Sequence, residues 1–251
     1  MAMFTGHDDL PADAGKRHFA TTHWSVVLAA GDRNALAAQG ALAALCEQYW
    51  YPLYVYVRRR VTNVEEAQDL TQAFFAHLIE KQVIARANRD RGRFRSFLLA
   101  SLKNFLDNEW NKARAEKRGG GKPVLSLDFD SGESRYQIEP AHEMTPEKLY
   151  ERRWVLTLID QVLALLQMEL ADEGKAQHFK YFKKSLIGSA TAAEYEFAAK
   201  ELGITPAAAK QAAYRMRRRY RQLFRDEVAR TVADDADVED EIRRLLRAIG
   251  E

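Results

Sequence analysis

Residues 192–225 read AAEYEFAAKELGITPAAAKQAAYRMRRRYRQLFR and contain two helix-like stretches around a short turn. The first stretch is Ala192–Leu202, and a Gly-Ile-Thr-Pro sequence leads into the second, Pro206–Arg225. A helix, a short turn that contains glycine and a second helix form the helix-turn-helix motif. Between Thr205 and Arg225 there are seven Lys/Arg and no Asp/Glu. The pattern therefore predicts a helix-turn-helix with a strongly basic second helix.

A second basic segment lies upstream of this motif. Arg89–Arg118 reads RDRGRFRSFLLASLKNFLDNEWNKARAEKR and carries nine Lys/Arg against four Asp/Glu. A stretch with scattered acidic residues separates the two basic segments. Since clustered cations neutralise nucleic-acid phosphates, two such segments on one chain indicate contact with nucleic acid at two places.

The bulk composition is typical of an intracellular globular protein. The chain has 251 residues, a formal net charge of +2 and one cysteine, so a disulfide framework within the chain is excluded. Cys46 lies among apolar residues, which favours a buried structural thiol over a nucleophile. No apolar run approaches the roughly 18 residues that span a bilayer. We therefore expect a cytoplasmic protein with no membrane insertion.

Apolar residues recur at helical spacing along most of the chain, and no strand pattern competes with them. We predict helices at Thr22–Ala30, Asn34–Arg60 (kinked or divided at Pro52), Val64–Ile84, Arg93–Lys117, Pro146–Ala171, Gln177–Leu186 and Val238–Ile249, besides the helix-turn-helix. The expected fold class is all-α, with two helical domains joined by a flexible linker. The predicted boundaries are a mobile tail at 1–20, a helical domain at 21–118, a linker at 119–145, a helix-turn-helix domain at 146–230 and an acidic amphipathic helix at 231–251.

The C-terminal segment has an apolar stripe that needs a surface to bury against. We expect it to pack on the helix-turn-helix domain and complete its core. The alternative is that its acidic residues fold back and screen Arg215–Arg221.

Three segments in order resemble one protein family. Glu65–Lys81 (EEAQDLTQAFFAHLIEK) is similar to region 2.2 of bacterial sigma-70-type transcription initiation factors. Gly92–Arg118 is similar to regions 2.3 and 2.4, and Ala198–Phe224 to region 4.2. Their order and spacing resemble the extracytoplasmic-function (ECF) subgroup, and the resemblance covers about residues 22–229.

This resemblance implies an RNA polymerase sigma factor that directs core polymerase to promoters. Region 2 would recognise and melt the −10 element, through Asn88, Arg89, Arg91, Arg93, Lys103, Asn104, Asn108, Trp110, Lys112 and Arg114. Arg95 would add charge to the same surface. Region 4 would read the −35 element, through Thr205, Lys210, Gln211, Tyr214, Arg215 and Arg218. From helical spacing we expect Phe94, Phe97 and Phe105 to belong to the core.

The resemblance also implies a set of protein partners. Core RNA polymerase would be contacted through its β′ clamp helices and its β flap, and the surface for the clamp helices would be Glu65, Glu66, Asp69 and Gln72. Many members of this family carry an acidic residue where Gln68 and Ala73 stand. An anti-sigma factor or a regulatory kinase is a further candidate partner, and phosphorylation of Thr62 or Thr71 would compensate for the weaker acidic patch; ordinary sequence drift is the alternative. No cofactor is implied.

Two other kinds of function remain open. The first alternative is a free-standing helix-turn-helix transcription regulator with a helical sensing or dimerisation domain. A second is an adaptor that holds acidic protein partners on its basic helices. An enzyme is not predicted, because the six histidines show no paired metal spacing and no glycine-rich phosphate loop follows a strand. We accordingly predict no catalytic residues and no metal ligands.

Overall fold

The computed structural model describes residues 24–31, 35–115, 127–137, 144–186 and 190–250. Within these ranges the chain forms ten α-helices, four short 3-10 helices and no strand. This confirms the predicted all-α fold class. The predicted N-terminal tail lies outside the described residues.

The helices follow one another with short connections. The N-terminal part holds α1 (Trp24–Gly31), α2 (Ala35–Arg60), α3 (Val64–Glu80), η1 (Val83–Arg86), η2 (Arg89–Arg91) and α4 (Phe94–Ala115). The remainder holds α5 (Phe129–Tyr136), α6 (Pro146–Asp172), α7 (Ala176–Phe182), η3 (Lys183–Leu186), α8 (Ala192–Leu202), α9 (Pro206–Ala229), η4 (Asp235–Asp237) and α10 (Val238–Gly250).

Several of the predicted helix bounds need correction, and the predicted helix Gln177–Leu186 is α7 followed by the 3-10 helix η3. Helix α2 runs unbroken through Pro52, so the chain does not divide into two helices there. Helix α3 ends at Glu80 rather than Ile84, because Gln82 adopts a left-handed backbone with φ 48° that a continuing helix does not allow.

The segment predicted as a linker contains helix α5, which docks on α2. Asp128 caps its start by accepting a hydrogen bond from Ser131 N at 3.2 Å. The Glu133 carboxylate accepts hydrogen bonds from Tyr54 Oη at 2.6 Å and Arg58 Nε at 3.1 Å. At Gly132 a Cβ would stand 2.9 Å from the Trp50 ring, so only glycine allows this close approach. Part of this acidic segment therefore packs against the core.

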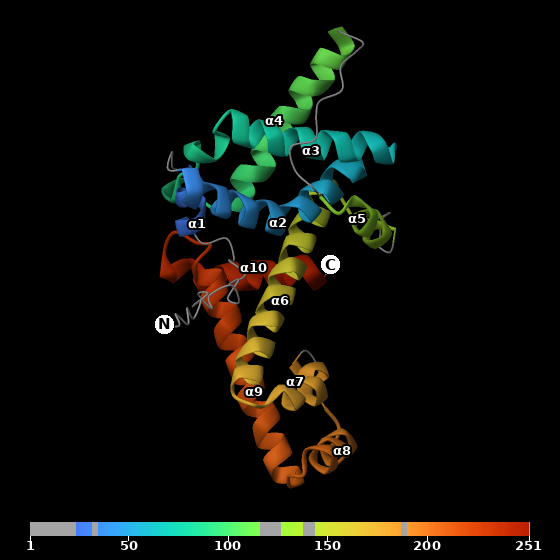
Figure 1. Cartoon of the computed structure of the whole chain (residues 1–251), viewed down its shortest axis with the longest axis vertical. Coiled ribbons are helices and arrows are strands. Elements are labelled where there is room, and N and C mark those ends of the chain that lie inside the picture. The colour runs from blue at the N-terminus through green and yellow to red at the C-terminus, as the bar shows by residue number, and fades with distance from the viewer. Residues whose placement is uncertain (1–23, 32–34, 116–126, 138–143, 187–189, 251) are drawn as a thin grey trace, which may run out of the picture.

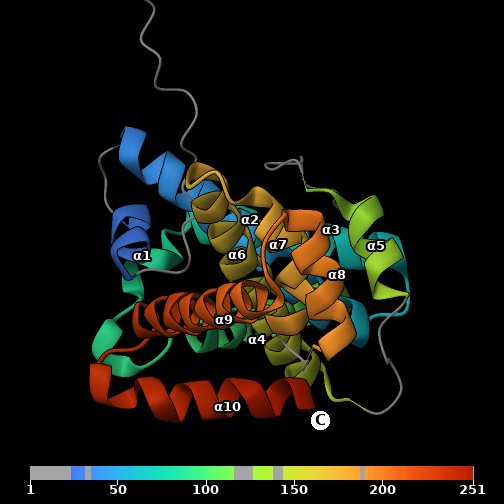
Figure 2. The same ribbon diagram turned by 90° about the horizontal axis from the view of Figure 1, so that it is seen from below.

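The molecule is elongated, with the two ends joined by a pair of long helices. Figure 1 shows α1–α5 at one end and α7 and α8 at the other, with α6 and α9 running between them. Helix α6 contacts α2, α9 and α10. Its 27 residues make it roughly 40 Å long at the standard helical rise. In Figure 2 α10 lies along one edge of the molecule, beside α9.

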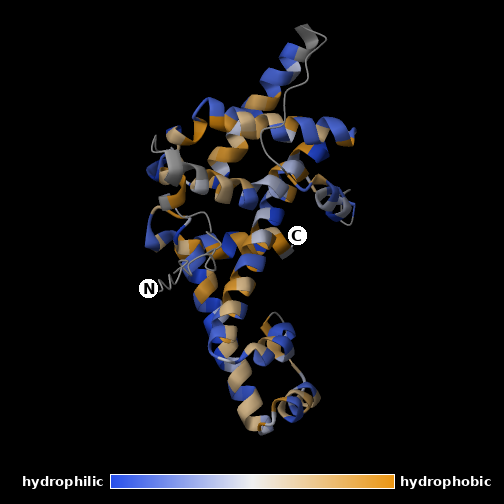
Figure 3. Cartoon of the chain, viewed as in Figure 1, coloured by the Kyte–Doolittle hydropathy of each residue, from blue (hydrophilic) through white to orange (hydrophobic). Residues whose placement is uncertain are grey.

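Buried side chains form one continuous core along this axis. The cluster runs from α1 and α2, which supply Val27, Leu53 and Val57, to α9 and α10, which supply Val228 and Leu245. Figure 3 shows hydrophilic residues on the outer end of α4 and along much of α3. The predicted division into two domains stays a prediction, since α6 contributes to the packing at both ends.

Helix α6 is long and apolar enough to cross a membrane by length and composition, and it is the single such helix among the described residues. A core helix of a globular protein passes the same test. Trp154, Val155, Leu158 and Val162 on α6 are buried against other helices, as expected of a core helix.

Candidate nucleic-acid interface

The helix-turn-helix is built by local sequence signals at each of its ends. Thr191 and Glu194 form a reciprocal capping box that starts α8. Gly203 ends that helix in the left-handed region at φ 65°, which glycine adopts without strain. Thr205 then caps α9 by accepting a hydrogen bond from Ala208 N at 3.2 Å, and Pro206 occupies the first helical position. Thr205 is exposed, and its hydroxyl has this local role.

The outer face of α9 carries the side chains predicted to read the −35 element. Lys210, Gln211, Tyr214, Arg215 and Arg218 are all exposed, and they repeat at intervals of three and four residues, so that they share one face. Tyr214 is 60% exposed although it is a large aromatic residue. Among the described residues, none forms a hydrogen bond or an ion pair with the side chains of Lys210, Gln211 or Arg218. This face is free to meet a ligand.

Other arginines of the same helix have structural roles. Arg219 binds Glu169 of α6 through two hydrogen bonds at 2.8 and 2.5 Å, and Arg217 Nε donates to the Ser185 carbonyl at 3.1 Å. Arg225 pairs with Glu239 of α10 at 3.0 Å. Within Arg215–Arg221, Arg217 and Arg219 thus pair with η3 and α6 rather than with α10, and the screening of this segment by α10 stays a prediction. Helix α10 packs on α6 and α9, as the main prediction had it.

The residues predicted for the −10 element fall into two groups. The first group is the turn before α4, where Asn88, Arg89 and Arg91 are exposed and Gly92, at φ 116°, turns the chain into the helix. The Asn88 side chain caps η2 by accepting from Asp90 N at 2.8 Å. Arg89 Nε donates to the Val232 carbonyl at 3.3 Å. This turn thus touches the segment that leads into α10.

The second group lies on α4 itself and divides between two faces. Asn104, Asn108 and Lys112 are exposed, and Lys112 pairs with Glu109 at 2.8 Å. Lys103 pairs with Glu147 of α6 at 2.7 Å.

Trp110 is half-buried, and the Arg60 guanidinium lies 4.7 Å from the centre of its ring. The Arg114 side chain lies outside the described part of the structure. Phe94 and Phe105 are buried and Phe97 is half-buried, which confirms that these aromatic residues belong to the core.

Two further arginines, one in the turn and one at the start of α4, are engaged rather than free. Arg93 is half-buried and forms an ion pair with Glu241 of α10 at 2.5 Å. Burial lowers the pKa of Arg93, and the Glu241 carboxylate counteracts this effect. Arg95 is 1% exposed and also pairs with Glu241. The expectation that Arg95 faces DNA is wrong for this conformation.

Sequence reasoning missed this cluster although a signal was present. Arg95 stands three residues before Leu98 on the apolar stripe of α4, and Glu241 stands between Val238 and Leu245 on the apolar stripe of α10. Charged residues are almost never fully buried unless they are paired. Opposite charges on two apolar stripes therefore indicated a buried pair.

The residues predicted to contact polymerase lie together on α3. Glu65, Glu66 and Asp69 are exposed and Gln72 is half-buried, and Glu65, Asp69 and Gln72 share one face by helical spacing. Of the two candidate phosphorylation sites, Thr62 is exposed. Thr71 is buried and donates a hydrogen bond to the Ala67 carbonyl at 2.7 Å, so this threonine is not accessible to a kinase.

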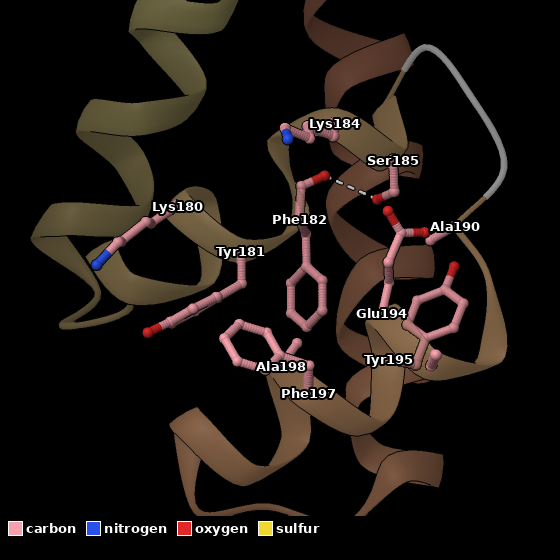
Figure 4. Close-up of a pocket in the computed structure, with 11 residues that line it drawn as sticks. Lys180, Tyr181, Phe182, Lys184, Ser185, Ala190, Glu194, Tyr195, Phe197 and Ala198 are labelled. Carbon is pink, nitrogen blue, oxygen red and sulfur yellow. Dashed lines mark hydrogen bonds between the residues drawn. The ribbon is translucent and has the colours of Figure 1, made fainter.

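A cavity of about 430 Å³ opens between α7 and α8, and no residue of the α9 recognition face lines it. Figure 4 shows the aromatic side chains Tyr181, Phe182, Tyr195 and Phe197 along it, with Lys180 and Lys184 beside them. Phe197 is 59% exposed. An exposed aromatic side chain in a concave apolar site is typical of a surface that receives a protein partner.

The single cysteine and His77 have the properties of packing residues. Burial raises the pKa of the Cys46 thiol to about 12, so the thiol is protonated at neutral pH, in agreement with a structural role. Burial also lowers the pKa of His77. Among the described residues, no three His, Cys, Asp or Glu side chains gather so as to hold a metal ion.

Comparison with known proteins assigns no family to this chain. No protein-family model matches it, and neither a curated protein nor a solved structure does so. The activity of the molecule must therefore be inferred from its own surfaces.

Proposed function

We propose that this protein is a promoter-specificity subunit of bacterial RNA polymerase, a sigma factor of the ECF type. The observation that carries the proposal is the free outer face of α9 in a complete helix-turn-helix. A recognition helix needs exposed side chains that can reach base edges, and Gln211 and Arg215 stand in its first turns. Gln pairs with adenine and Arg with guanine in the major groove. This face would read the −35 element.

The turn before α4 and the exposed face of α4 would contact the −10 element. Arg89 and Arg91 are exposed cations on the turn, and Asn104 and Asn108 present amide groups further along the helix. Cations bind phosphates, and amides bind either phosphates or base edges. Melting of DNA needs such a surface to hold the separated strand.

Contacts with core polymerase would use two further surfaces. The acidic face of α3, centred on Asp69, suits a basic partner such as the β′ clamp helices. The aromatic cavity between α7 and α8 suits an apolar segment, and we assign it to the β flap. A free-standing DNA-binding regulator does not need a separate acidic face for a basic protein partner, and the acidic face of α3 therefore favours the sigma factor over that alternative.

The test is binding to purified core polymerase, followed by transcription in vitro from genomic fragments. We expect the protein to bind core enzyme in the absence of DNA and to direct initiation at defined start sites. Tight DNA binding without any core binding would identify the regulator instead. Binding to acidic proteins with neither activity would identify the adaptor.

A further inference from the structure

The C-terminal helix α10 carries a carboxylate into the interior of the molecule. The Glu241 side chain is fully buried and lies within ion-pair distance of both Arg93 and Arg95. These two arginines belong to the turn and first residues of α4, far from Glu241 in the sequence. A buried carboxylate is stable when paired with cations, so Glu241 holds α10 against the start of α4.

The partners of Arg95 extend this cluster to α6. Its guanidinium lies 4.5 Å from the centre of the Trp154 ring and 3.9 Å from the Glu151 carboxylate. Glu151 in turn accepts a hydrogen bond from Arg244 of α10 at 2.8 Å. Helices α4, α6 and α10 are therefore joined by one group of alternating charges.

This cluster holds α10 in place without satisfying all of its polar groups. Arg95 Nη2 and both oxygens of Glu241 take part in the ion pairs, whereas Arg95 Nε and Nη1 have no hydrogen-bond partner among the described residues. Unsatisfied buried polar groups cost free energy. Helix α10 also buries apolar side chains: Val238 and Leu245 fully, and Ile242, Ala248 and Ile249 in part, while Leu246 is 54% exposed. Docking of α10 therefore combines apolar burial with a pairing of Arg93 and Arg95, and nucleic-acid phosphates can neutralise the same two arginines.

We propose that α10 is a releasable latch, which masks Arg93 and Arg95 while it is docked and exposes them to nucleic-acid phosphates when it leaves. The identity of the ligand, DNA, rests on the proposed function, whereas the docking and release of α10 do not depend on it. A phosphate on the DNA strand would compete with Glu241 for the two arginines. The docked state would therefore restrain DNA binding at the −10 surface.

Hydrogen exchange of the full chain, measured by mass spectrometry without DNA, tests the latch. Glu241→Gln keeps the shape of the side chain but removes the buried charge. The matched control is Glu239→Gln on the same helix, which changes the net charge equally but affects an exposed pair with Arg225. We expect exchange in residues 238–250 and 89–95 to rise about tenfold or more in Glu241→Gln alone. Equal exchange in the parent and Glu241→Gln would overturn the proposal.

A milder variant covers the case in which Glu241→Gln unfolds. Glu151→Gln removes the charge that α6 contributes to the cluster, and the Glu151 side chain is 19% exposed. We expect faster exchange in the same two segments, by a smaller factor. If exchange instead rises uniformly over the whole chain, or stays unchanged, α10 is not a separate latch.

Binding of labelled single-stranded DNA over a series of salt concentrations tests the masking. Each additional phosphate contact steepens the log–log salt dependence by about 0.7. We expect Glu241→Gln to bind more tightly than Glu239→Gln, with a slope steeper by one or two such contacts. Faster exchange with equal DNA binding would overturn the masking. Failure of the parent to bind core polymerase would count against the proposed function alone, because the exchange experiment needs no polymerase.

Discussion

The two basic regions of this molecule are both rich in Lys and Arg, but their cations are exposed in one and paired in the other. On α9 the side chains of Lys210, Gln211 and Arg218 are exposed and unpaired among the described residues. Before α4, Arg93 and Arg95 are tied to Glu241 of α10. The difference arises from what packs beside each helix, since α9 turns one face to solvent at the end of the molecule whereas the start of α4 lies under α10. Density of positive charge therefore does not by itself identify a DNA-binding surface.

The largest effect is expected on stability, when the buried charge of Arg95 is removed. Arg95→Met leaves the Glu241 carboxylate buried with one partner fewer, and we expect the free energy of unfolding to fall by about 3 kcal/mol. Arg91→Met, on the exposed part of the same turn, should change it by less than about 0.5 kcal/mol. Urea denaturation followed by circular dichroism measures both. Equal midpoints for the two variants would mean that the buried pair contributes nothing to stability.

A smaller effect is expected on polymerase binding, when a charge on the acidic face of α3 is reversed. Asp69→Arg reverses an exposed charge that should meet a basic surface, and we expect affinity for core polymerase to fall about tenfold. Helical circular dichroism should remain that of the parent, because Asp69 is exposed. Glu80→Arg, at the far end of the same helix, is the control for a nonspecific charge effect. If both variants lose affinity equally, the contact is not centred on Asp69.

Two neighbouring arginines sharpen the comparison within α9. Arg218 is free, whereas Arg219 is bound to Glu169 of α6. We expect Arg218→Ala to weaken binding to all DNA sequences and to lower the log–log salt slope by about one. Arg219→Ala should leave that slope unchanged. A salt titration of promoter binding by the holoenzyme distinguishes the two, and equal slopes would remove Arg218 from the DNA surface.

The smallest effect is expected for the pH dependence of stability, at the end of the molecule that contains α5. Burial raises the pKa of Glu133, but hydrogen bonds from Arg58 and Tyr54 outweigh it, so the pKa lies below its ordinary value of 4.5. A carboxylate with a lowered pKa adds stability above pH 4.5 and loses it as the pH falls through the folded-state value.

We therefore expect the unfolding free energy of the parent to fall more steeply below pH 4.5 than that of Glu133→Gln. Because both partners of the pair are 16% exposed, the difference should be about 1 kcal/mol or less. Thermal unfolding at a series of pH values measures it. Parallel curves for the two proteins would show that Glu133 does not contribute to the acid sensitivity.

Local signals in the sequence were sufficient to predict most of the helices and the helix-turn-helix. Gly203 and Pro206 mark the turn, and the predicted range Ala192–Leu202 is confirmed as α8. Capping and helical periodicity act over a few residues, so they can be read from neighbouring positions. Helix α5 was missed because its eight residues have few apolar positions, and it depends on contacts with Trp50, Tyr54 and Arg58 far away in the chain.

The sequence by itself determined the all-α class, the position of nearly every helix and the basic character of α9. Tertiary structure alone decided which charges are available. Arg95 and Arg218 are the same residue type on basic helices, yet one is buried beside Glu241 and the other is exposed. Exposure depends on which helix packs against which, and that is settled by long-range burial of apolar surface rather than by local propensity.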